Sequence, residues 1–163
     1  MKLSYDDSKL KRRLLALASR LNNSFKATET SSPVSEHNMK EALIIADELG
    51  SLLICIDYAH RESKYKTLFQ KLQSVRFILT HIYQEEYHYG SYQECVDIEE
   101  VHLYQAVSAS MQDKLVRDKL VAELPAKWQD ILSDLEELKV AEPELSQLFA
   151  PYLPKITSVI NHL

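Results

Sequence analysis

Three side chains near the end of one apolar helical run could carry chemistry: Arg76, His81 and Tyr83, in Arg76-Phe-Ile-Leu-Thr-His81-Ile-Tyr83. A guanidinium can hold a phosphate through two hydrogen bonds, and an imidazole can take and return a proton near neutral pH. These groups suit cleavage of RNA by its own 2′-hydroxyl, because that reaction needs proton transfer and charge stabilisation but no metal. We therefore take all three as predicted catalytic residues.

The helical period sets a condition on this site. At about 100° per residue, Arg76 and Tyr83 share a face of the helix, whereas His81 lies to one side. One chain therefore points the arginine and the histidine partly apart, and a joint site needs the helix end or a second subunit. The alternative is structural, with an arginine at the core edge and a histidine at a helix end. Burial of either side chain against its own core would favour that alternative.

The spacing Arg76-x4-His81-x-Tyr83 resembles the signature of HEPN domains in prokaryotic toxin–antitoxin and defence systems, in the branch paired with minimal nucleotidyltransferases. The resemblance implies a homodimer that brings both Arg/His pairs into one cleft and acts as a metal-independent ribonuclease. It also implies that Tyr83 matches the residue that a partner nucleotidyltransferase adenylylates. The sequence departs from the family at Phe77, where a polar residue, often asparagine, usually follows the arginine, and in an insertion over 84–93.

A metal site is a second interpretation of the same helix end. His81, Glu85 and His88 fall at positions i, i+4 and i+7, which is one face if the helix persists to His88. These residues flank a tyrosine-rich break around Gly90 rather than the interior of a bundle. We therefore expect no metal and no cofactor, and keep a metal-binding helical bundle as the weaker alternative.

A non-catalytic interaction module, such as an adaptor or chaperone, is the alternative function. Amphipathic C-terminal helices and a tyrosine cluster could bind a protein, because phenols often anchor interfaces. The net charge of −5 argues against nonspecific nucleic-acid binding, although RNA stays a candidate partner for a basic face on the first helix. The tyrosine cluster comprises Tyr83, Tyr87, Tyr89, Tyr92 and Tyr104, and the basic face Lys11, Arg12, Arg13 and Arg20.

Composition excludes several other classes. The chain of 163 residues is 45% hydrophobic and 26% charged, which is typical of a globular protein. Its two glycines exclude a P-loop and a dinucleotide-binding fingerprint. Without a signal peptide, a membrane-spanning run or metal-spaced cysteines, we expect a cytoplasmic protein with no membrane partner. The expected partners are a second copy in a homodimer and a protein partner, either an antitoxin or a client.

Apolar residues recur at steps of three and four along most of the chain, which predicts helices. We expect an all-α fold, an antiparallel four-helix bundle core with one or two additional C-terminal helices that pack on the same core. It forms one domain over 1–163, with the bundle core over about 7–123 and the C-terminal helices over about 126–163. Predicted helices cover 7–25, from Ser35 or Asn38 to about 61, 64–88, and from 96–99 to 123, with further helices opened by Pro125 and Pro143.

Overall fold

The structure, a computed structural model, describes residues 16, 36–60, 63–83 and 98–163. Every regular element in these residues is an α-helix and none is a strand, which confirms the all-α class. The predicted first helix falls almost wholly outside them. No helix in the described ranges is both long enough and apolar enough to cross a membrane.

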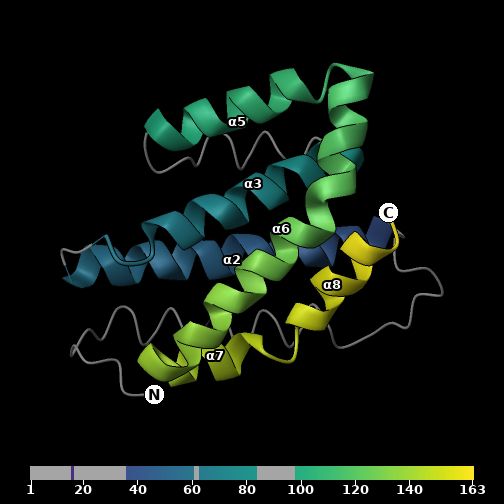
Figure 1. The fold of residues 1–163 in the computed structure, drawn as a ribbon. Coiled ribbons are helices and arrows are strands. Elements are labelled where there is room, and N and C mark those ends of the chain that lie inside the picture. Colours follow the sequence, from purple (N-terminus) through teal and green to yellow (C-terminus); the bar gives the residue numbers. More distant parts are fainter. Residues whose placement is uncertain (1–15, 17–35, 61–62, 84–97) are drawn as a thin grey trace.

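Helices α2 (Glu36–His60) and α3 (Lys66–Tyr83) pack along each other and form the centre of the fold (Figure 1). The Asp57 carboxylate accepts hydrogen bonds from the Tyr65 backbone N–H at 2.8 and 3.0 Å, which fixes the turn into α3. A Cβ at Gly50 would lie 3.2 Å from the Phe69 ring, so a glycine permits the close approach of these helices. The apolar residues that recur at steps of three and four along these two helices are buried, apart from the partly buried Ile82: Met39, Leu43, Ala46, Leu49, Leu53, Ile56, Leu68, Leu72, Val75 and Leu79.

Helix α5 (Ile98–Ser110) lies along α3 and is followed by the long helix α6 (Lys114–Ala141) (Figure 1). The prediction of one helix continuing to Glu123 is wrong, because α5 ends at Ser110 and a separate helix begins at Lys114. Asp113 starts a new helix there, since its carboxylate accepts hydrogen bonds from Leu115 N at 2.9 Å and Val116 N at 3.2 Å.

Pro125 was predicted to open a helix, and this prediction is also wrong because Pro125 lies inside α6. A proline removes one hydrogen bond of the helix and crowds the preceding turn, and α6 changes direction along its length (Figure 1). The Pro125 side chain is exposed. Burial of the turns that follow, from Leu124 to Leu138, holds the helix together across the proline.

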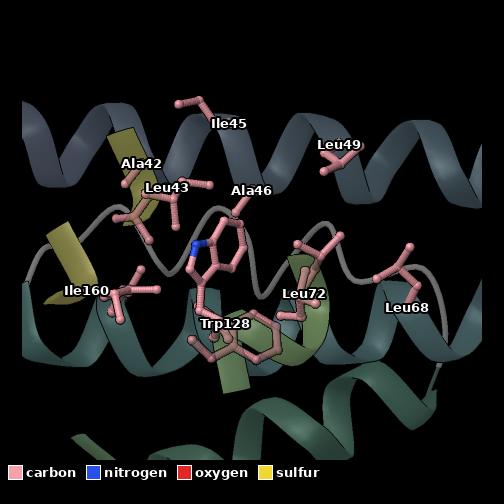
Figure 2. Packing of buried hydrophobic residues seen from close by; sticks show 14 of the residues in the cluster. Ala42, Leu43, Ile45, Ala46, Leu49, Leu68, Leu72, Trp128 and Ile160 are labelled. Carbon is pink, nitrogen blue, oxygen red and sulfur yellow. The ribbon is translucent and has the colours of Figure 1, made fainter. Parts of the chain in front are cut away.

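Helices α7 (Pro143–Phe149) and α8 (Leu153–Asn161) begin with prolines in their first turns, as predicted for Pro143. Helix α8 packs on both α2 and α6. Figure 2 shows the indole of Trp128 from α6 among Ala46 of α2, Leu72 of α3 and Ile160 of α8. The prediction that the C-terminal helices share the core is therefore confirmed.

Candidate functional site

The Arg76 guanidinium is buried between α3 and α2, with only 2% of the residue exposed. Its Nη1 donates hydrogen bonds to Asp47 Oδ1 at 2.5 Å and to Gln73 Oε1 at 2.9 Å. Its Nη2 has no hydrogen-bond partner among the residues that the structure describes. The guanidinium is buried and its Nη1 already bonds Asp47 and Gln73, so a phosphate could reach it only if the contact between α2 and α3 opened, and the geometry favours the structural alternative for Arg76.

The His81 ring is half-buried in the last turn of α3, where it lies against Tyr104 of α5. Its centroid lies 5.7 Å from that of Tyr104, which is buried and makes an edge-to-face contact with Phe77 at 5.0 Å. Arg76 and His81 therefore contact different neighbouring helices, which confirms the prediction that they point apart.

Phe77 explains how the motif departs from the HEPN pattern. It is fully buried, and its ring packs against Tyr104 while the Arg76 guanidinium carbon lies 5.1 Å from its centroid. The position that is usually polar in the family is thus a core position in this chain.

Several predicted site residues fall outside the part of the chain that the structure describes. Tyr83 ends α3, but its side chain is not described, and the predicted extension of this helix to residue 88 also lies outside. Tyr104 is buried, so it contributes to the core rather than to an exposed tyrosine surface. In the described ranges, no three His, Cys, Asp or Glu side chains are arranged to hold a metal. Outside them lie Glu85, His88, Tyr87, Tyr89, Tyr92 and the basic residues Lys11, Arg12, Arg13 and Arg20.

A groove of about 520 Å³ lies between α6, α7 and α8, and sequence analysis did not locate it. We call it the C-terminal groove. Leu132, Leu135 and Leu153 provide much of its apolar lining. The sequence does contain one indication of this groove. Leu132 follows Ile131 directly, so the apolar face of α6 is wider than the single stripe that contact with one neighbouring helix requires. The remaining lining residues are Glu136, Lys139, Ser146, Ala150, Pro154, Thr157, Ser158 and His162.

Several polar side chains of the C-terminal groove bond other groups of the protein. Lys139 Nζ lies 2.9 Å from Glu136 in an exposed pair, which contributes little to stability. The Thr157 hydroxyl accepts a 2.7 Å hydrogen bond from the Trp128 indole and donates to the Leu153 carbonyl. His162 Nδ1 lies 2.8 Å from the Ser158 carbonyl, which accepts a hydrogen bond in the tautomer protonated at Nδ1.

A second, smaller hollow of about 350 Å³ lies between α3 and α6. Lys71 Nζ lies 2.8 Å from both Asp130 and Asp134, and these hydrogen bonds raise the pKa of Lys71. The charges of this hollow largely neutralise one another, and its polar groups therefore hold α3 to α6.

Comparison with protein families, curated proteins and solved structures finds no match to this chain.

Proposed function

We propose that this chain is a non-catalytic helical interaction module that binds a partner protein through the C-terminal groove. The observation that carries the proposal is the groove itself, an apolar-lined hollow on three helices that pack on the common core. Apolar pockets with a few polar groups at their edges are typical of binding sites. The burial of Arg76 beside Asp47 adds support, because it takes the cation of the motif out of reach of a phosphate.

A photo-crosslinking residue placed at Ser158, inside the groove, tests this proposal in the cells that produce the protein. We expect a discrete adduct with one reproducibly identified protein. The same residue at Lys119, exposed in the first half of α6, serves as the matched control and should give no such adduct. Absence of an adduct from Ser158, or equal labelling from both positions, would contradict the proposal.

The ribonuclease hypothesis stays a prediction with its own test. Its support is the Arg76, His81 and Tyr83 spacing at the end of α3 in an all-α chain. RNA cleavage and growth inhibition should be compared for the wild type and His81→Ala, and the oligomeric state measured by sedimentation. We expect the two proteins to behave alike. Cleavage by a wild-type dimer that is lost in His81→Ala would overturn the non-catalytic proposal.

A further inference from the structure

We propose that α5 and the first half of α6 form a hinged arm, which swings away from α3 about Pro125 and uncovers the α3 surface around Phe77. The arm comprises residues 98–123. The C-terminal groove lies on the other side of the hinge, because its lining begins at Leu132 and comes from the second half of α6, from α7 and from α8. Opening of the arm is therefore independent of what the groove binds.

The two halves of α6 are held to the fold differently. The buried residues of this helix all lie after Glu123: Leu124, Trp128, Ile131, Leu135 and Leu138. Polar contacts with other helices also lie in this second half, at Trp128, Asp130 and Asp134. From Lys114 to Glu123 every residue is exposed or only partly buried. No side chain in that first half forms an ion pair or a hydrogen bond within the part of the chain that the structure describes.

Helix α5 is attached to the described part of the fold chiefly through α3. Three side chains between residues 101 and 123 are buried, and each of them keeps 5–8% of its surface exposed: Tyr104, Val107 and Met111. The Tyr104 ring meets the Phe77 ring edge to face, with the centroids 5.0 Å apart. The arm can therefore leave α3 at the loss of few buried contacts, whereas separation of α2 from α3 would open the centre of the core.

Pro125 provides the point at which the arm can turn. It lacks the N–H that would bond the carbonyl of Val121 one turn earlier, and α6 changes direction along its length (Figure 1). A proline is well suited to the first turn of a helix, where the missing N–H costs no hydrogen bond. The second half of α6 can therefore begin at Pro125 as a shorter helix when the arm opens.

Opening of the arm changes what α3 presents to solvent. In the closed arrangement the Phe77 ring is fully buried, and Tyr104 covers it from the side of α5. His81 lies beside the same tyrosine, with ring centroids 5.7 Å apart. Release of α5 takes this cover from an apolar ring and an imidazole that are one helical turn apart on α3. The arm thus controls access to this part of the helix.

Cysteine labelling of the full chain under native conditions tests the opening. Val107→Cys places a thiol at a buried position of the arm, and Val75→Cys places one in α3 on the side away from Phe77. Reaction with iodoacetamide is followed by peptide mass spectrometry, which separates these thiols from Cys55 and Cys95. We expect Val107→Cys to react at least about tenfold faster than Val75→Cys, because release of the arm leaves the rest of the core folded.

The substitution Pro125→Ala distinguishes opening of the arm from static exposure of Val107. Alanine restores the missing N–H and favours an unbroken α6, so it should slow the reaction of Val107→Cys at least about tenfold. Gln129→Ala is the matched control, since it exchanges one good helix former for another at an exposed position after the hinge, and should leave the rate unchanged. Circular dichroism and thermal unfolding establish that the variants fold.

Two outcomes would overturn the proposal. Equal reaction rates for Val107→Cys and Val75→Cys would mean that α5 leaves α3 only when the whole chain unfolds. A rate for Val107→Cys that Pro125→Ala does not change would mean that static exposure, or fraying of α5 alone, admits the reagent. Neither result bears on crosslinking from Ser158, which tests the C-terminal groove separately.

Discussion

Asp47 on α2 and Arg76 on α3 form an ion pair with unequal exposure, since 44% of the Asp47 side chain is exposed but only 3% of that of Arg76. The carboxylate can be hydrated when its partner is removed, whereas the guanidinium cannot. The free energy of unfolding should therefore depend on which partner is lost.

Asp47→Ala should destabilise the protein more than Arg76→Met. The first change leaves a buried cation with only Gln73 as a described partner, and should cost about 2–3 kcal/mol. The second replaces the cation by an apolar chain and should cost about 1 kcal/mol or less. Urea unfolding measures both. A larger loss of stability for Arg76→Met than for Asp47→Ala would show that packing of the arginine side chain stabilises the fold more than its ion pair with Asp47 does.

Phe77→Asn restores the residue that often follows the arginine in HEPN domains, and it should unfold the protein rather than activate it. Phe77 is fully buried against Tyr104, so the change removes an aromatic ring and buries an amide, at about 3–5 kcal/mol. Phe77→Leu, which stays apolar, is the control and should cost less. A folded Phe77→Asn variant that gains RNA cleavage would support the ribonuclease hypothesis instead.

Thr157→Val should weaken the attachment of α8 to α6. The Trp128 indole N–H donates to the Thr157 hydroxyl at 2.7 Å, and valine of similar shape leaves that buried donor without an acceptor. We expect a loss of about 1–2 kcal/mol, measured by denaturant unfolding. Thr157→Ser keeps the hydroxyl and should lose less. A loss of stability in Thr157→Val that is no larger than the loss in Thr157→Ser would contradict the assignment of the effect to this hydrogen bond.

Tyr65→Phe should reduce the sensitivity of the protein to alkaline pH. Burial, followed by the nearby Glu142 charge, raises the pKa of Tyr65, so the folded state favours the neutral phenol. An unfolded tyrosine ionises near about pH 10, and the Tyr65 contribution is therefore complete below that pH and is lost as pH rises through the higher folded pKa. Unfolding midpoints at about pH 9 and about pH 11 should differ less in Tyr65→Phe than in the wild type.

Two observations provide controls for this experiment. The raised pKa of Lys71 acts in the same alkaline range with the same sign, so some pH dependence should remain in Tyr65→Phe. The buried Tyr65 hydroxyl makes no hydrogen bond of good geometry with a described residue, and Lys64 interacts with it only weakly, so at neutral pH the variant should lie within about 0.5 kcal/mol of the wild type. If the unfolding midpoint of Tyr65→Phe shifts between the two pH values as much as that of the wild type, Tyr65 does not cause the alkaline sensitivity.

Helical periodicity predicted the all-α class and the buried faces of α2 and α3, because a packed helix must repeat its apolar residues every three or four positions. It failed between Ser110 and Lys114, where the apolar pattern runs on although Asp113 starts a new helix. The prediction that Pro125 opens a helix failed for another reason: packing of the turns that follow Pro125 outweighs the hydrogen bond that the proline removes from α6.

The candidate site was less accessible to prediction for a different reason. The helical period predicted that Arg76 and His81 point apart. The hydrogen-bond partner of Arg76, Asp47, lies 29 residues away on α2, and no residue pattern near Arg76 indicates it. The C-terminal groove likewise depends on how α6, α7 and α8 meet, which no residue spacing within one helix specifies.

The hydrogen bond of Lys155 with Asn38 joins residues 117 positions apart, so it can form only long after α2 has been synthesised. Helices α2 and α3 can meet as soon as both leave the ribosome, held by the local hydrogen bond that the Tyr65 N–H donates to Asp57. The α2 surface that takes Ile160 and Lys155 stays uncovered until α8 emerges much later. The nascent chain thus exposes an apolar strip on α2 until α8 has been synthesised, and chaperones can bind this strip before α8 covers it.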